Sequence, residues 1–188
     1  LDYSQAAPYP AELVVSGVSN AQQLAVELHG LSHEVPADLD LLLVAPTGAA
    51  VLLMSSAGNY FQVENLNLAF ADFGVELPSF LALESSVYRP GSYSGAVSLP
   101  PPAPSQPYAA QLNELLAEPN GVWRLYAADA FWGGAGHLAS WALHFTSTPP
   151  AVGAAVKLQA SGQEVSWQQT GSAWVTLQRS QDLLTWQT

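Results

Sequence analysis

The chain has 188 residues, of which 49% are hydrophobic, enough for one domain of ordinary size and a shorter remainder. Fifteen acidic residues oppose four basic ones, and the formal charge is −11. Binding of nucleic acid or of an anionic membrane surface requires clustered Lys or Arg, so neither is an expected partner. The absence of cysteine excludes disulfides and thiolate metal sites, and the apolar runs are too short for membrane insertion.

The first third of the chain has the pattern of β-strands. Residues 13–15 form a short apolar strand, and residues 24–29 alternate between apolar and polar side chains, as in a strand with one buried face. Residues 39–44 are almost continuously apolar, which indicates a strand covered on both sides. The turn at 46–48 leads to a return strand at 51–54, so a hairpin is predicted here.

The middle of the chain is rich in Pro and Gly. Their density in residues 88–108 excludes a helix or a central strand, and the apolar residues among them indicate an ordered surface loop. A short helix is predicted over 109–118. Strands return over 122–127 and over 138–145, where Trp141, Leu143 and Phe145 share one face.

The last forty residues differ in character from the rest. Residues 149–188 contain three short alternating segments, too few for a complete fibronectin type III sandwich. We therefore expect two units: a β-sandwich over 1–148, and a partial or small β module over 149–188, of fibronectin type III character or packed on the first unit. The predicted fold class is all-β, a jelly-roll-like β-sandwich with a short C-terminal β extension.

Two separated segments carry a specific pattern. In the first, His33 precedes Asp38-Leu39, an apolar strand, Ala45-Pro46-Thr47-Gly48 and a second apolar strand. The second has Gly121-x-Trp-x-Leu, an Asp, a Gly-rich turn and Trp141-x-Leu. In this order they resemble the P domain of kexin-like proprotein convertases and of bacterial subtilisin-like proteases, over about residues 9–146.

The resemblance implies a non-catalytic accessory domain. Such a domain is covalently linked to an upstream catalytic domain, such as a serine endopeptidase, or to a surface domain, and it stabilises or regulates that domain. It implies a secreted or cell-surface location, in a bacterium. Because the chain begins at Leu1, we expect a processed piece or an excised fragment of a longer protein.

Calcium is the candidate cofactor, because it binds to several converging carboxylate and carbonyl oxygens. The candidate ligands are Asp38, Asp40 and Asp129, with Asp72 a weaker fourth. The chain departs from the family pattern at Ser56, where relatives often carry Asp. The alternative is that Asp38 caps a turn and that Asp40 is hydrogen-bonded or solvated.

Aromatic residues in loops suggest a second function. Phe131 and Trp132 lie in a Gly-rich turn and are the candidate contacts with a ligand or partner. A binding module for carbohydrate or for a surface protein is therefore the alternative function, and packing in the core is the competing role of these rings.

No catalytic residue is predicted. His29 and His33 have a spacing that pairs ligands on a helix, but the local pattern is strand and turn. Residues 91–95 resemble a Gly-x-Ser-x-Gly elbow with Tyr93 in place of the serine, outside a strand-to-helix context. No pair of carboxylates stands out as glycosidase residues.

Overall fold

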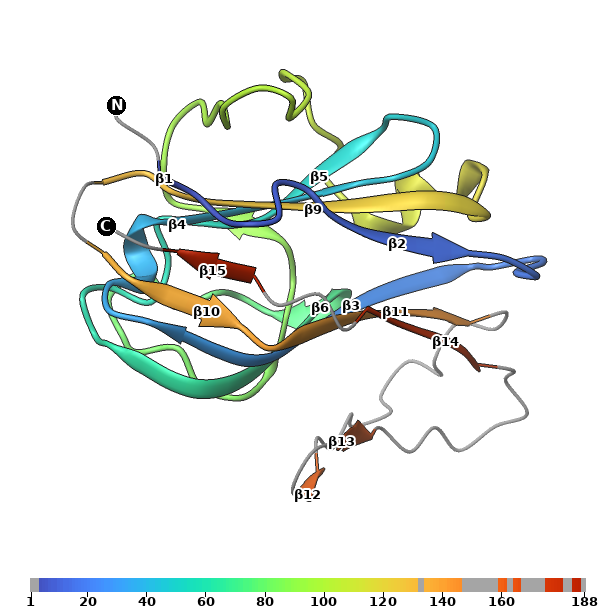
Figure 1. Cartoon of the computed structure of the whole chain (residues 1–188). Coiled ribbons are helices and arrows are strands. Elements are labelled where there is room, and N and C mark those ends of the chain that lie inside the picture. Colours follow the sequence, from blue (N-terminus) through green and yellow to red (C-terminus); the bar gives the residue numbers. More distant parts are fainter. Residues whose placement is uncertain are drawn as a thin grey trace.

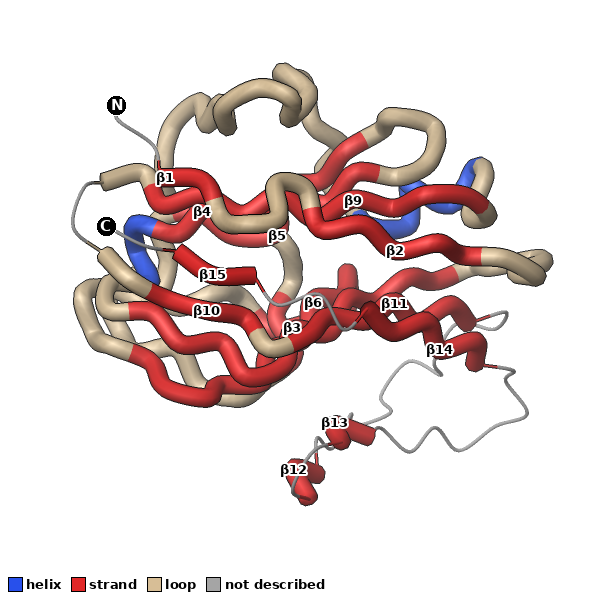
Figure 2. The backbone as a smooth tube through the Cα atoms, in the orientation of Figure 1, coloured by secondary structure: helices blue, strands red, loops and turns tan. Residues whose placement is uncertain are grey.

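A computed structural model describes residues 4–131 and 134–146, together with the strands 159–161, 164–166, 175–180 and 184–186. Strands dominate, and they form two sheets that face each other (Figure 1), so the predicted all-β sandwich is confirmed. The loops gather at the ends and over one sheet (Figure 2). None of the helical segments in these ranges has the length and apolar character needed to cross a membrane.

The first sheet is centred on β9 (Gly121–Asp129). One edge of β9 pairs with β4 (Leu39–Val44), and the other edge pairs with β2 (Ala11–Val15) and then β1 (Ser4–Gln5). The sheet ends with β5 (Ala50–Ser55), which forms the predicted hairpin with β4, and the parallel strand β8 (Gly91–Ser92).

The second sheet is centred on the long strand β3 (Gln23–His33). One edge of β3 pairs with β6 (Val63–Val75), and the other pairs with β11 (Ser140–Thr146) and then β10 (Gly136–Leu138). The parallel strand β7 (Val87–Tyr88) lies beside β6.

Two strands of the C-terminal part extend this second sheet. β14 (Val175–Ser180) pairs with β11, and β15 (Leu184–Trp186) pairs with β10. β12 (Gln159–Ser161) and β13 (Glu164–Ser166) pair with each other. The division of the chain at residue 148 stays a prediction.

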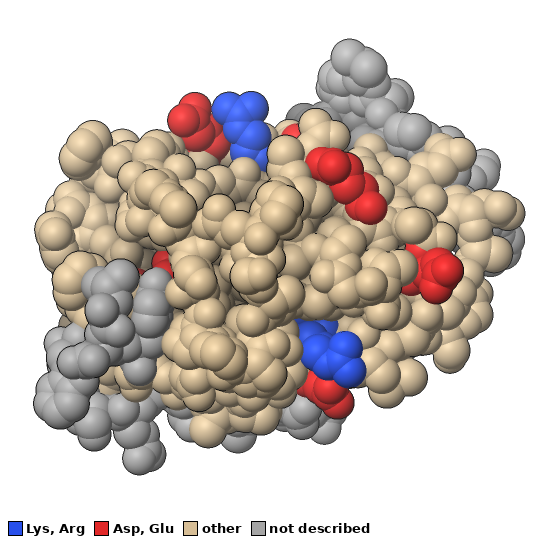
Figure 3. Space-filling model, turned by 90° about the horizontal axis from the view of Figure 1, so that it is seen from above, with Lys and Arg blue, Asp and Glu red and all other residues tan. Residues whose placement is uncertain are grey.

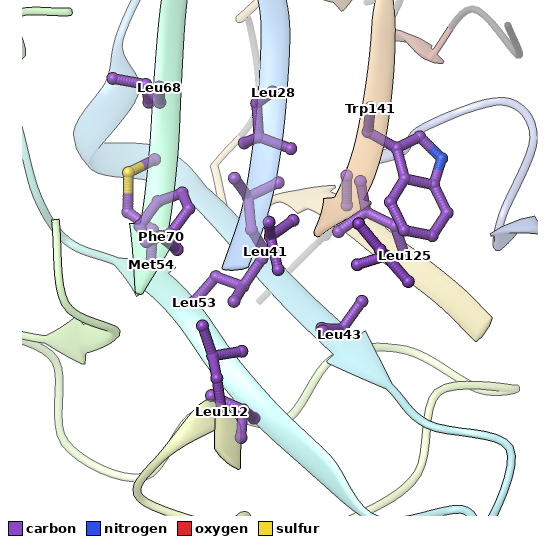
Figure 4. Packing of buried hydrophobic residues seen from close by; sticks show 14 of the residues in the cluster. Leu28, Leu41, Leu43, Leu53, Met54, Leu68, Phe70, Leu112, Leu125 and Trp141 are labelled. Carbon is purple, nitrogen blue, oxygen red and sulfur yellow. The ribbon is translucent and has the colours of Figure 1, made fainter. Parts of the chain in front are cut away.

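The core lies between the sheets and is built by alternate residues of each strand. Figure 4 shows side chains from both sheets, Leu28 and Leu41 among them, pointing into the same space. Trp123 and Trp141 are fully buried there, and the Trp123 ring packs edge-on against Phe145 with centroids 5.8 Å apart. Truncation of either indole to alanine would cost about 3–5 kcal/mol.

The loop of residues 88–108 is ordered, as predicted. It covers the outer face of the first sheet, where Val97 and Leu99 are buried against Leu42 and Tyr126. β4 is consequently buried on both faces over its whole length, which explains its nearly unbroken apolar sequence.

Two elements differ from the prediction. In place of the helix expected over 109–118, the structure has the 3-10 helix η2 (Leu112–Ala117). The strand expected over 138–145 is interrupted at Ala139, which lies against Gly30 in the neighbouring strand. Gly30 has φ of +67° at a bulge of β3, and this bulge separates the partners β11 and β10.

β6 was not predicted from the sequence. Its inward residues Val63, Leu66 and Leu68 are spaced by three and then by two, because Asn65 is a second bulge with φ of +51°. The bulge conceals the period of two on which strand prediction depends.

Candidate functional site

The polar residues of the two sequence motifs meet in the protein interior. His33 at the end of β3 and Asp129 at the end of β9 both face the space between the sheets. The His33 Nε2 and Asp129 Oδ2 atoms are 3.4 Å apart, and both side chains are buried. The pair therefore links the two sheets within the apolar core.

The hydrogen bonds indicate the protonation of this pair. The Val35 amide donates to His33 Nδ1 over 3.2 Å, so the ring proton is assigned to Nε2, facing Asp129. Burial lowers the pKa of His33, although the negative charge of Asp129 opposes this shift. Burial raises the pKa of Asp129, against the effects of the Phe131 amide and of His33. The arrangement favours a neutral imidazole.

Two glycines close over the pair. A Cβ atom on Gly134 would lie 2.4 Å from Asp129 Oδ2, and one on Gly136 would lie 2.5 Å from both His33 Cδ2 and the Ser32 carbonyl oxygen. The Gly-rich turn of the second motif is therefore explained by close packing on this pair.

The structure brings two of the three candidate calcium ligands near each other. Asp38 ends the 3-10 helix η1 (Pro36–Asp38) and is half-buried. Burial raises the pKa of Asp38, and the charge of Asp129 raises it further. Asp40 lies on the outer face of β4, where its charge affects the pKa of Tyr108. Asp40 and Asp129 thus face opposite sides of one sheet.

Asp72 has a structural role. Its carboxylate accepts the amide hydrogens of Leu112 and Asn113 over 2.7 Å and 3.0 Å, at the start of η2. Within residues 4–131 and 134–146, no three His, Asp or Glu side chains are grouped as a metal site. Calcium bound at Asp38 and Asp129, with carbonyl oxygens completing the set, stays a prediction.

The predicted partner contacts are only in part described. Phe131 is 57% exposed, in agreement with its loop position. Trp132 lies outside the described residues. Contact between Phe131 and a ligand stays a prediction.

Sequence reasoning missed a cluster on the outer face of the second sheet. Glu27 Oε2 lies 2.9 Å from His144 Nε2 and 3.1 Å from His29 Nε2. The Glu27 side chain is only 4% exposed. Burial would raise the pKa of Glu27, but hydrogen bonds and positive charge from His144 and His29 outweigh it, and the pKa is lowered.

A signal for this cluster was present in the sequence. Glu27 lies directly opposite Ala142 in the β3–β11 ladder, and His144 is two residues further along the same face. Aligning the two alternating segments antiparallel would have placed Glu27 and His144 together. The pairing of His29 with His33, by contrast, is ruled out, because the Gly30 bulge leaves them on opposite faces.

Comparison with protein-family models, with curated proteins and with solved structures finds no match to this chain.

Proposed function

We propose that this chain is a non-catalytic accessory module of P-domain type, which stabilises or regulates a domain attached to it. The observation that carries the proposal is the buried contact between His33 and Asp129. These residues come from motifs about ninety positions apart that resemble the P domain, and their meeting supports the view that both motifs serve one fold.

The burial of this pair supports a structural role over a catalytic one. A general base must reach the proton that it abstracts, but the His33 side chain is fully buried. Tyr93, the central residue of the elbow-like segment, donates its hydroxyl hydrogen to the Leu77 carbonyl. Neither residue presents an activated group to a substrate.

The surface charge fits a secreted or cell-surface module linked to an upstream enzyme. The two arginines whose side chains the structure describes are paired, Arg89 with Glu76 and Arg124 with Glu12. On the face shown in Figure 3, basic groups lie beside acidic ones and most of the remaining surface is uncharged. Among the described residues, this surface offers no cationic patch for nucleic acid or anionic lipid.

The test is a comparison of the parent polypeptide with and without this module. We expect the attached domain to melt at a lower temperature, or to change its activity, when residues 1–188 are deleted. An attached domain that is unaltered in stability and in activity would contradict the accessory role. So would turnover of a peptide substrate by the isolated module.

Calcium is part of this proposal, and Asp38 with Asp129 is its site. Burial raises the pKa of both acids, and the charge of Asp129 raises the pKa of Asp38 further, so a bound cation would offset the cost of their negative charges. We expect excess calcium to raise the melting temperature and Asp38→Asn to abolish the rise. Calcium at one hundred times its Kd would contribute about 2.7 kcal/mol. An equal melting temperature in calcium and in chelator would count against the site. Glu118→Gln is the control variant.

The exposed ring of Phe131 favours a second candidate function, the binding of a carbohydrate or of a protein partner. Aromatic residues are enriched at protein interfaces relative to the rest of the surface, and their rings can stack on sugars.

A further inference from the structure

We propose that the outer face of the second sheet carries a saccharide-binding groove where β10, β3 and β6 lie side by side. The inference deepens the second candidate function, and it assigns the binding to residues other than Phe131 and Trp132. It rests on the shape of this surface, on the side chains that line it and on its charge.

The groove has a volume of about 640 Å³. This volume falls in the range of small-molecule sites in proteins, about 300–1,000 Å³. Its lining includes the polar side chains of Ser32, Glu34, Gln62, Glu64, Asn65 and His137, beside His33, Val63, Ala135 and Gly136.

The register of the three strands explains why these side chains share one face. His33 faces the core and pairs with Val63 of β6 and with Gly136 of β10. Their chain neighbours therefore face outward, and Ser32 lies directly opposite His137. Glu64 and His137 are exposed at the two sides of the groove.

Internal hydrogen bonds hold part of this lining in place. Gln62 Nε2 donates to Glu64 Oε1 over 3.0 Å, and the backbone amide of Asn65 donates to Ser32 Oγ over 2.9 Å. A binding surface that is ordered before the ligand arrives loses less entropy on binding.

The chemistry of the lining matches neighbouring hydroxyl groups. A sugar hydroxyl both donates and accepts, and the groove offers carboxylate acceptors together with amide and imidazole groups that can do either. Tyr60 and Phe61, 77% and 52% exposed, directly precede Gln62. Neither of these rings lines the groove itself.

The charge of the groove selects among saccharides. Glu34 and Glu64 are exposed, and no Lys or Arg of the described residues lines the groove. Uronic or sulfated sugars would be repelled, whereas neutral or amino sugars would be accepted.

The experiment is calorimetric titration of the chain with four probes: cellohexaose, chitohexaose, a chitosan hexamer and hexagalacturonate. We expect at least one of the first three to bind and hexagalacturonate not to bind. Gln62→Ala and Glu64→Gln should each weaken binding about fivefold, the effect of one hydrogen bond.

Matched variants outside the groove serve as controls. Glu118→Gln and Phe73→Ala change an exposed acid and an exposed ring elsewhere, and should leave binding unaltered. Three outcomes would overturn the proposal: binding by none of the four probes, tight binding of hexagalacturonate, or binding that the groove variants leave unchanged. Since the altered side chains are exposed, the melting temperature of these variants should not change. Failure of saccharide binding would not bear on the accessory role, which has a separate test.

Discussion

At the scale of single residues, Glu27 gives the clearest prediction of pH dependence. Its lowered pKa means that the ionised carboxylate stabilises the fold above the pKa of the unfolded chain, and that this stability is lost as pH falls through the folded pKa. Glu27→Gln should therefore cost about 1–3 kcal/mol near neutral pH, because His29 and His144 lose their common charged acceptor.

Urea unfolding of both proteins across the acidic range measures this effect. The two curves of unfolding free energy should converge on acidification, and Glu118→Gln should follow the unaltered chain. A difference that persists in acid would show that packing, and not charge, is responsible.

Gly136 gives a steric prediction at the same scale. An added Cβ would meet the Ser32 carbonyl oxygen and the His33 ring, both at 2.5 Å. Gly136→Ala should destabilise the fold by about 1–3 kcal/mol, as overpacking does elsewhere. Gly95→Ala is the control, since nothing lies within 4 Å of its added Cβ. Equal denaturation midpoints for the two variants would contradict the predicted clash.

At the scale of elements, η2 depends on a residue distant in sequence. Asp72 of β6 accepts the first two amide hydrogens of this helix, which have no partner within it. Asp72→Ala should cost about 0.5–2 kcal/mol, and Asp72→Asn less, because an amide oxygen still accepts. Thermal melting of both variants measures which substitution costs more stability. If Asn proves as damaging as Ala, the charge of Asp72, and not its hydrogen bonds, carries the effect.

The elements differ in how far the sequence predicts them. The β4–β5 hairpin was predictable because its apolar strands and its turn are adjacent in the chain. β6 was not, because a bulge interrupts its alternation. The helical segment expected over 109–118 lies within those bounds, but it is shorter and of the 3-10 type, and Asp72, forty residues earlier, accepts its first two amide hydrogens.

At the scale of the whole molecule, the C-terminal strands protect a sheet edge. β11 pairs with β3 on one side and with β14 on the other. Deletion of residues 175–188 should expose that second edge, and its amides should exchange hydrogen at least about tenfold faster. Hydrogen exchange followed by NMR measures this, with β9 as the internal reference. Unaltered exchange along β11 would show that β14 does not protect it.

The candidate sites depend on features that only the folded molecule shows. The motifs predicted Asp38 and Asp129 as near neighbours. Asp40 faces the opposite side of the sheet, because successive side chains of β4 alternate between its two faces. The Glu27 cluster requires the register of two strands and the groove that of three, which a single alternating pattern does not define. Candidate site residues were therefore predictable where they lie in one segment of the sequence. The meeting of side chains from different strands was not.

The two bulges at Gly30 and Asn65 have a consequence for how this sequence can change length. Each adds one residue to its own strand, and the added residues lie across the same ladder, so the register before and after them is kept. Losing both residues together with Ala139, which lies opposite Gly30 between β10 and β11, would leave every inward side chain inward and every register kept, whereas losing a residue beyond these positions would turn the remainder of that strand inside out. Length variation in β3 and β6 should therefore arise as matched changes at Gly30, Asn65 and Ala139.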